Sequence, residues 1–174
     1  MNILIKNNRG FTLIEMVVVM LIIGIISAVV ISRLMDTSVE LIAQTDVIKT
    51  HLRYAQSMAM SDNSVWGISC DGNRYYWLYN NGNIANMVGL PGEDKDSEDK
   101  YRIDFTVSAD QDPRWQHVDT IEAFTLSFDD RGIPHTDASA TVKLTSDHDY
   151  SQITVSSGGK SKRITIAPNT GFIP

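Results

Sequence analysis

Glu15 is the residue whose position most needs a chemical explanation. It lies inside FTLIEMVVVMLIIGIISAVVI, residues 11–31, which is apolar except for Thr12, Glu15 and Ser27. A charged group at bilayer depth costs roughly 2.5–3.5 kcal/mol on insertion scales, and less near a helix end. A chain that keeps a carboxylate there is therefore expected to use its charge.

A second candidate site is the basic patch Gly159-Lys160-Ser161-Lys162-Arg163, the one concentrated group of cations after the apolar run. Lysine can contact a phosphate as a point charge, but it lacks the planar fork of arginine. Three positive charges on an acidic domain predict weak, strongly salt-dependent binding to nucleic acid. We favour a solvated hairpin edge, and keep Lys160, Lys162 and Arg163 as candidate DNA contacts.

An acidic stretch, residues 94–99, alternates carboxylates in a way that could surround a hard cation. It lacks the glycine and the bidentate glutamate at the spacing of an EF-hand, and Lys95 and Lys100 add positive charge. We therefore expect a solvated acidic loop rather than a calcium site. Asp147-His148-Asp149 is interpreted in the same way, as a turn between strands.

The histidines and the single cysteine form no pattern typical of a metal site or of nucleophilic catalysis. His51 lies in a predicted helix one residue before Leu52, and we expect it to be partly exposed. The other three fall in expected loops: His117, His135 and His148. The chain has no H-x-x-x-H, C-x-x-C or G-x-S-x-G spacing. Cys70 ends an apolar strand and is expected to fill the core. We predict no enzymatic activity, no metal and no cofactor.

Length and charge limit the class of protein. The chain has 174 residues, a formal net charge of −6 and one cysteine, so it has room for one domain with an extension and forms no internal disulfide. Only two acids, Glu15 and Asp36, fall among the first 39 residues, so the acidity belongs to the remainder. An acidic body argues against broad nucleic-acid binding.

The apolar run is long enough to span a membrane. Its length at 1.5 Å per residue is roughly 30 Å, the thickness of a hydrocarbon core. Lys6 and Arg9 precede the run and predict a cytoplasmic N-terminus. A cleaved secretory signal peptide is the alternative, but it needs a small-residue cleavage site after the run. Ala28 is a poor one, because a helical pattern continues beyond it, so any cut is expected before the run.

A second helical segment, residues 34–62, follows the apolar run. Its apolar residues recur at helical spacing and predict one buried stripe: Leu34, Leu41, Ile48, Leu52, Ala55 and Ala59. Neither proline nor glycine interrupts residues 26–60. We therefore predict one continuous helix from about Phe11 to Met60, whose second half packs on the rest of the chain.

From residue 63 the period changes to that of strands. SVWGISC and RYYWLYN flank the turn Asp71-Gly72-Asn73, which predicts a hairpin. A surface loop is expected from residue 81 to residue 100. Further strand candidates lie at 101–107, 121–128, 140–145, 151–157 and 162–168. Together these segments predict an α+β protein: a long N-terminal helix packed on an antiparallel sheet of about six strands.

The residues Gly10-Phe11-Thr12-Leu13-Ile14-Glu15 ahead of an apolar helix resemble the prepilin motif of type IV pilins and type II secretion pseudopilins. The strand that ends in Phe128-Asp129-Asp130-Arg131-Gly132, with the closing residues 163–173, is similar to the GspH/FimT group of minor pilins and pseudopilins. That group includes minor pilins of mannose-sensitive haemagglutinin pili. Ser32 stands where many major pilins have proline, and no C-terminal cysteine pair is present, as fits a minor pilin.

The resemblance implies a pilin-like protein with four parts. Residues 1–10 are a leader, which a prepilin peptidase removes between Gly10 and Phe11 before the new amino terminus is methylated. Residues 11–33 are a transmembrane or filament-core helix, 34–62 an amphipathic helix and 63–174 a periplasmic β domain. Glu15 then pairs with the Phe11 amine of a neighbouring subunit, and the pair contributes mainly specificity and register because desolvation offsets most of its net stabilisation.

The implied function is structural. The chain is expected to help initiate, prime or cap a type IV pilus or a type II secretion pseudopilus, with its C-terminal domain on the periplasmic side of the inner membrane of a Gram-negative bacterium. The expected partners are other minor pilins or pseudopilins, the major pilin, the membrane assembly platform and the prepilin peptidase.

Three alternatives remain open at this point. They are a DNA-binding competence pilin, an adhesin and a membrane-anchored periplasmic enzyme. An adhesin would bind glycans through exposed aromatic side chains. The candidates are Trp66, Tyr75, Tyr76, Trp77, Tyr79 and Trp115, and we expect at least half of these six to lie in the core instead.

Overall fold

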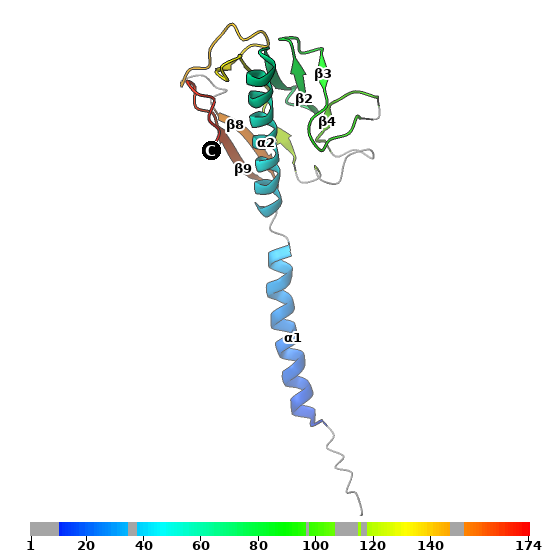
Figure 1. Ribbon diagram of the computed structural model, residues 1–174. Helices are drawn as coiled ribbons and strands as arrows, with labels where there is room; N and C mark the ends of the chain where they lie inside the picture. Colours follow the sequence, from blue (N-terminus) through cyan, green and yellow to red (C-terminus); the bar gives the residue numbers. More distant parts are fainter. Residues whose placement is uncertain (1–10, 35–37, 97, 107–114, 116–117, 147–151) are drawn as a thin grey trace, which may run out of the picture. The chain divides into compact units, whose positions relative to one another are not determined.

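The computed structural model describes residues 11–34, 38–96, 98–106, 115, 118–146 and 152–174 (Figure 1). These residues fall into two compact units, residues 1–36 and residues 37–174. Four features of the sequence interpretation lie outside the described residues: the expected leader with Gly10, His117, the expected turn at 147–149 with His148, and the side chain of Leu34.

Helix α1 (Leu13–Leu34) and the two residues before it are the described part of the first unit. Helix α2 (Ser38–Asp62) begins the second unit. Residues 35–37 between them lie outside the described residues, so the continuous helix from Phe11 to Met60 stays a prediction at that point. Helix α2 ends at Asp62, and Asn63 takes a φ of 51°, the left-handed conformation that commonly follows a helix.

The buried stripe of α2 is confirmed. Its described members are at most 1% exposed: Leu41, Ile48, Leu52, Ala55 and Ala59. Thr45 occupies the gap between Leu41 and Ile48, and its hydroxyl donates to the Leu41 carbonyl at 2.6 Å, which satisfies the buried hydroxyl within the helix. The stripe works because 3.6 residues per turn keeps these positions on one face.

The first sheet is antiparallel and contains the predicted hairpin. Its strands lie in the order β3-β2-β1-β6-β7, and β4 also pairs with β2. Their bounds are β1 (Trp66–Cys70), β2 (Tyr75–Asn80), β3 (Met87–Val88), β4 (Ile103–Asp104), β6 (Phe124–Phe128) and β7 (Pro134–His135). At the β1–β2 turn, Asp71 Oδ1 accepts the N–H groups of Arg74 at 2.8 Å and Tyr75 at 2.9 Å, so a side chain closes the hairpin.

A second sheet departs from the single sheet that we expected. It has the order β5-β8-β9, with β5 (Thr120–Ile121), β8 (Gln152–Ser157) and β9 (Lys160–Thr165). The expected strand at 121–128 is divided between the two sheets. The Glu122 N–H still donates to the Thr154 carbonyl at 3.0 Å, whereas Phe124 pairs with Cys70 in the first sheet. Residues 122–123 are therefore the crossover between the sheets.

Four other expected boundaries were wrong. In the described part of the expected strand at 101–107, only β4, Ile103–Asp104, is a strand. The segment 140–145 contributes only a bridge between Lys143 and His135, because Asp137 accepts the N–H groups of Thr141 and Val142 and holds this segment as a turn. The expected loop at 81–100 contains β3. The last strand begins at Lys160 rather than at residue 162, since Gly158 and Gly159 both take positive φ and make a two-residue hairpin turn.

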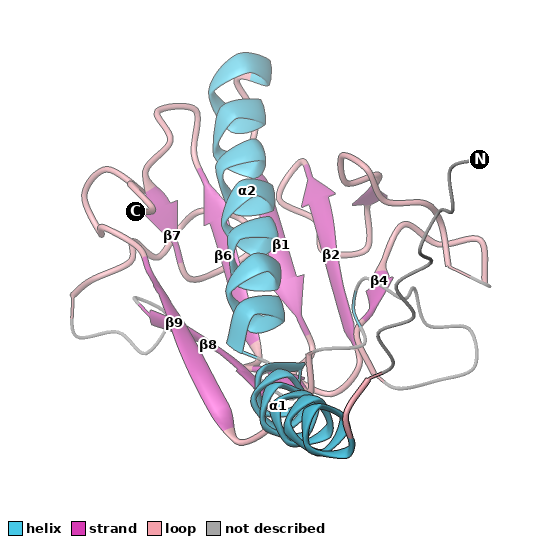
Figure 2. Ribbon diagram, turned by 90° about the horizontal axis from the view of Figure 1, so that it is seen from below, coloured by secondary structure: helices cyan, strands magenta, loops and turns pink. Residues whose placement is uncertain are grey.

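Helix α2 joins the two sheets into one core. It contacts β1 and β6 of the first sheet and β8 and β9 of the second. Figure 2 shows α2 lying over β1 and β6 of the first sheet, with β9 beyond one side of it. The second unit is thus an α+β fold with the buried stripe of α2 at its centre, as expected.

Strand β1 is buried over its whole length, and its glycine makes room for a neighbour. A Cβ at Gly67 would lie 2.4 Å from the Tyr79 hydroxyl oxygen and 2.5 Å from the Leu126 carbonyl oxygen. The Tyr79 side chain therefore packs over a position that only glycine can occupy without displacing both neighbouring strands.

Candidate functional site

The start of α1 places Phe11 and Glu15 at a capped helix terminus. Gly10 lies outside the described residues, and the Phe11 side chain is exposed. The Thr12 hydroxyl accepts the N–H of Glu15 at 3.3 Å, so Thr12 is the N-cap and Glu15 is the third residue of the helix. This T-x-x-E spacing is the capping-box signature, a signal that our sequence interpretation missed. The Glu15 carboxylate also suits the positive end of the helix dipole.

The side chains of α1 are apolar and exposed on every side. All side chains from residue 11 to residue 27 are exposed, including Leu13 at 83% and Met20 at 72%. The hydroxyl of Ser27 donates to the Ile23 carbonyl at 2.7 Å, so this polar group needs no partner outside the helix. A helix that is apolar all round is stable only when lipid or protein covers it.

A membrane span was the expectation for residues 11–33. Within the described residues, no helix is both long enough and apolar enough to cross a membrane. The side chains of residues 28–34 lie outside the described part of the chain.

The structure does not gather the three candidate DNA contacts on one face. Lys160, Lys162 and Arg163 are all exposed on β9. Successive side chains of a strand point to opposite faces, so Lys160 and Lys162 share a face with buried Ile164, and Arg163 lies on the other. A phosphate backbone that contacted all three would have to follow both faces of one strand.

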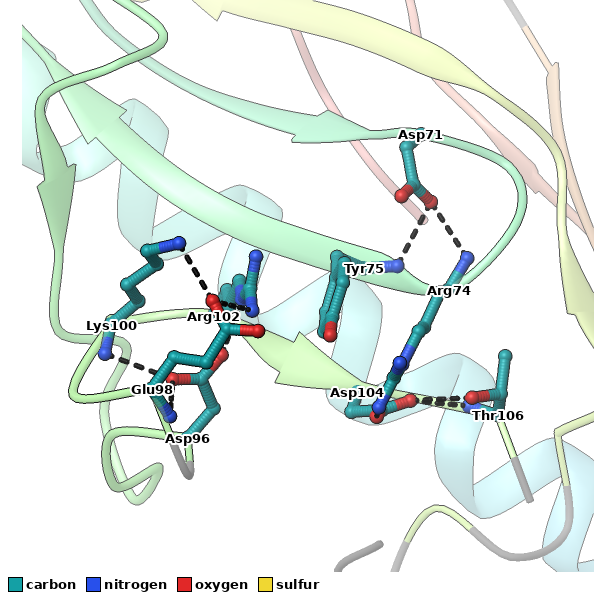
Figure 3. Close-up of polar contacts among 9 residues, drawn as sticks. All are labelled: Asp71, Arg74, Tyr75, Asp96, Glu98, Lys100, Arg102, Asp104 and Thr106. Atoms are coloured by element: carbon teal, nitrogen blue, oxygen red, sulfur yellow. Dashed lines mark hydrogen bonds and ion pairs between the residues drawn. The ribbon is translucent and has the colours of Figure 1, made fainter. Parts of the chain in front are cut away.

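A cluster of charged residues connects the loop before β4 to the start of β2 (Figure 3). Arg102 donates to Asp96, and its Nη2 lies 2.9 Å from Glu98 Oε2. Asp96 Oδ1 also accepts the N–H groups of Glu98 and Lys100, each at 2.9 Å. The Asp96 side chain is only 9% exposed. The expectation of a solvated acidic loop is therefore wrong at Asp96, whose carboxylate holds the loop together by accepting hydrogen bonds from it.

Tyr75 lies between two guanidinium groups at one end of this cluster. The Arg102 guanidinium carbon is 3.6 Å from the ring centre of Tyr75, and that of Arg74 is 4.9 Å away. Figure 3 shows the ring between the two arginine side chains. The Arg74 Nε in turn donates to Asp104 Oδ2 at 2.7 Å. Both arginines are thus paired with a carboxylate while they contact the ring.

The environment of these carboxylates lowers their pKa values. Burial acts to raise the pKa of Asp96, but hydrogen bonds from Arg102, Lys100 and Glu98 outweigh it, and the pKa falls below its ordinary value. The pKa of Asp104 is lowered for the same reasons: burial acts to raise it, but hydrogen bonds from Arg74 and Thr106 outweigh that effect. The lowered pKa values favour the ionised form of Asp96 and Asp104, which suits their pairing with Arg102 and Arg74.

A small cavity adjoins the cluster and is lined by Tyr75, Asp94, Arg102 and Trp115 among others. Its volume is about 110 Å³, enough for a few water molecules. Binding sites for drug-sized ligands occupy roughly 300–1,000 Å³. Neither the paired charges nor this volume indicates a substrate pocket.

His51 is buried rather than partly exposed, which corrects the sequence interpretation. It is 3% exposed, and its Nδ1 forms a hydrogen bond with the hydroxyl of Tyr76, which is fully buried. His135, expected in a loop, is also buried, lies in β7 and has its Nδ1 2.9 Å from the Ile133 carbonyl. Cys70 fills the core as predicted, and burial raises its pKa to about 12, which keeps the thiol protonated.

The described part of the chain shows neither a group of metal ligands nor a gathering of exposed aromatic side chains. No group of three or more His, Cys, Asp or Glu there is arranged to hold a metal ion. More than half of the aromatic candidates are in the core: Trp66, Tyr76, Tyr79 and Trp115. Both faces of Tyr75 are covered by arginines, so its ring is not free to stack on a sugar.

Comparison with known proteins agrees with the two parts of this architecture. The prokaryotic N-terminal methylation motif matches residues 5–31, and the family described as type II transport protein GspH matches residues 44–168. No curated protein and no solved structure matches the chain. The methylation motif covers the capped start of α1, and the GspH match covers most of α2 and both sheets. Because the second match extends over more than half of the sequence, the chain belongs to the GspH family of type II transport proteins, as a GspH-like minor pilin or pseudopilin.

Proposed function

We propose that the chain is a filament subunit whose helix α1 is held in the inner membrane before assembly and packs among the helices of other subunits afterwards. The observation that carries this proposal is the exposure of apolar side chains on every side of α1 as far as residue 27. Lipid and neighbouring helices are the two environments that cover such a surface. The subunit helps to initiate, prime or cap a type IV pilus or a type II secretion pseudopilus.

Maturation prepares α1 for this role. A prepilin peptidase cuts between Gly10 and Phe11, removes residues 1–10 with their cations Lys6 and Arg9, and leaves a methylated amine on Phe11. The N-terminus is cytoplasmic before cleavage, and residues 37–174 lie in the periplasm. The partners are other minor pilins or pseudopilins, the major pilin and the membrane assembly platform.

Glu15 gives the assembled helix its register. Its carboxylate forms an ion pair with the positively charged Phe11 amine of a neighbouring subunit, and each charge neutralises the other in an apolar environment. Desolvation offsets most of the attraction, so the pair selects one axial position rather than adding much affinity. The capping box at Thr12 holds Glu15 at the helix terminus where the partner amine arrives.

The test compares Glu15→Gln with Glu15→Ala in cells that assemble the filament. Glutamine keeps the capping capacity of position 15 but not its charge, whereas alanine removes both. We expect both variants to be processed and to fractionate with the membrane, and both to be lost from sheared filaments. Mass analysis of the mature N-terminus, with immunoblots of membrane and filament fractions, gives the readout.

Two results would contradict the proposal in different ways. Normal incorporation of Glu15→Gln together with loss of Glu15→Ala would assign the residue to helix capping. A mature N-terminus beyond Ala28 would show that α1 is discarded, and the chain would then not be a filament subunit.

A further inference from the structure

Strand β9 is an edge of the second sheet. In the described part of the chain it pairs with β8 alone, while β8 pairs with β5 on its other side. An edge strand presents backbone donors and acceptors that another extended chain can pair with.

The register identifies which backbone groups point outward. The carbonyls of Thr154 and Ser156 accept N–H groups of Glu122 and Asp119, at 3.0 and 2.9 Å, so these residues of β8 direct their backbone groups toward β5. Their partners across the β8–β9 ladder are Arg163 and Ser161. In an antiparallel pair, residues opposite such positions also point away from each other. The N–H and C=O groups of Ser161, Arg163 and, two residues on, Thr165 therefore face the free edge.

The side chains along this edge carry concentrated positive charge. Lys162 and Arg163 are exposed on opposite faces of β9, and no described residue forms an ion pair with either. The chain as a whole has a net charge of −6. This edge is thus a basic strip on an acidic protein, and cations on both faces can contact an added strand from both sides.

This combination discriminates among possible partners. Lysine at an edge opposes pairing with another basic edge, so β9 is protected against pairing with its own copy in a second molecule. Nucleic acid would use the cations but not the outward backbone groups, and Lys162 and Arg163 do not converge on one face. An extended acidic peptide satisfies the backbone groups and both cations together.

We propose that the free edge of β9 is a docking site for an extended acidic segment of another protein, which adds a fourth strand beside Ser161, Arg163 and Thr165. This inference goes beyond the filament role of α1 and does not depend on Glu15. The partner segment is expected to carry two successive carboxylates, one opposite Lys162 and one opposite Arg163, because neighbouring residues of a strand reach opposite faces.

The test uses the full-length chain in detergent micelles and a fluorescent peptide of sequence TVTEEVTV. A matched peptide of the same sequence, N-methylated on alternate residues, keeps the charge and blocks pairing along one edge. We expect anisotropy to show binding of the first peptide and an affinity about tenfold or more lower for the methylated one. Amide exchange is expected to slow at Ser161, Arg163 and Thr165 and to stay unchanged at Lys162 and Ile164.

Variants of the protein test the same edge while the peptide is kept unchanged. Ser161→Pro removes one outward N–H without taking a bond from the ladder with β8, since proline is tolerated at free edges. Lys162→Glu and Arg163→Glu reverse the charge on each face. All three are expected to weaken peptide binding. Arg131→Glu, on the exposed β6–β7 turn of the first sheet, changes net charge equally and is expected to leave binding intact.

Four outcomes would overturn the proposal. Two concern the peptides: no binding at millimolar peptide, or equal binding of the methylated and unmethylated peptides. The other two point to a different partner: a single-stranded oligonucleotide that binds more tightly and displaces the peptide, or self-association of the chain that Ser161→Pro abolishes. The unchanged far-ultraviolet circular dichroism of each variant would show that loss of binding is not loss of fold. Filament incorporation of the same variants separates this site from the proposed role of α1, which they leave untouched.

Discussion

The guanidinium carbon of Arg102 lies 3.6 Å from the ring centre of Tyr75, and the same guanidinium is paired with Asp96 and Glu98. One planar group therefore serves two purposes: its face contacts the ring and its edge binds carboxylates. The arrangement attaches the loop before β4 to the first strand pair of the sheet. A stack of this kind depends on the flat shape of arginine and not only on its charge.

Replacing Arg102 by lysine is expected to destabilise the second unit by about 1–2 kcal/mol, because lysine keeps the charge and loses the planar face and the fork. Urea unfolding of the detergent-solubilised chain, followed by tryptophan fluorescence, measures the change. The control is Arg131→Lys, whose side chain is 78% exposed and which should shift stability by less than about 0.5 kcal/mol. Equal effects of the two variants would contradict a special role of the stack.

Acid is expected to weaken the same loop. The folded-state pKa of Asp96 is lowered, so its carboxylate contributes stability above its unfolded pKa of about 3.9, and this contribution is lost as the pH falls through the lowered value. The wild-type chain should exceed Asp96→Asn in stability at about pH 6, and the difference should shrink at about pH 3. Urea unfolding at both pH values provides the measurement. A difference that stays constant would show that the interaction does not need the charge.

Gly67→Ala is expected to cost about 1–3 kcal/mol through overpacking, since its Cβ would lie within 2.5 Å of both the Tyr79 side chain and the Leu126 carbonyl. Adding Tyr79→Phe removes the hydroxyl contact but leaves the contacts with the ring carbon Cζ and with the Leu126 carbonyl, both at 2.5 Å, so only part of the loss should be recovered. Thermal unfolding of the single and double variants gives the comparison. Full recovery would mean that the hydroxyl alone requires the glycine.

Two side chains of α2 hold the C-terminal segment. Arg53 Nη2 donates to the Ile173 carbonyl at 2.8 Å, and Gln56 Nε2 donates to the carbonyls of Gly132 and Thr170 at 2.8 and 2.9 Å. Arg53→Ala and Gln56→Ala should each cost about 1–2 kcal/mol and speed amide exchange near residue 171.

Thr50→Ala is the matched control for this pair of variants, because among the described residues the Thr50 hydroxyl bonds to the Asp46 carbonyl of the same helix alone. It should change stability by less than about 0.5 kcal/mol and leave exchange at the C-terminal residues as it was. An equal acceleration in the control would show that the C-terminal segment responds to any change in α2.

The parts of the fold that sequence reasoning found are those with a local signal. Five residues of α2 were placed in the core by their period, and the Asp71 hairpin by its turn residues. These features depend on neighbours in sequence, so their pattern is complete within a short window. The prepilin motif is likewise contained in a few adjacent residues.

The features that the sequence did not predict depend on partners that are distant along the chain. His51 is polar and adjoins the stripe, and the hydroxyl of Tyr76, 25 residues away, forms a hydrogen bond that helps to make its burial favourable. Asp96 looked solvated because its alternating neighbours are charged, whereas Arg102 and backbone N–H groups enclose it. The crossover at residues 122–123 carries no glycine or proline, so nothing local marked the change of sheet. The T-x-x-E spacing from Thr12 to Glu15 is a local signal that predicts the capped start of α1.

The buried stripe of α2, from Leu41 to Ala59, also has a mechanical consequence. At 1.5 Å per residue its two ends are about 27 Å apart along the helix axis. Because the stripe is embedded against strands of both sheets, a force along that axis would load all of its contacts in parallel, as in shear, rather than peel them away in sequence. Traction applied to the helix would thus be shared by the whole domain, and rupture would require many side chains to slip at once.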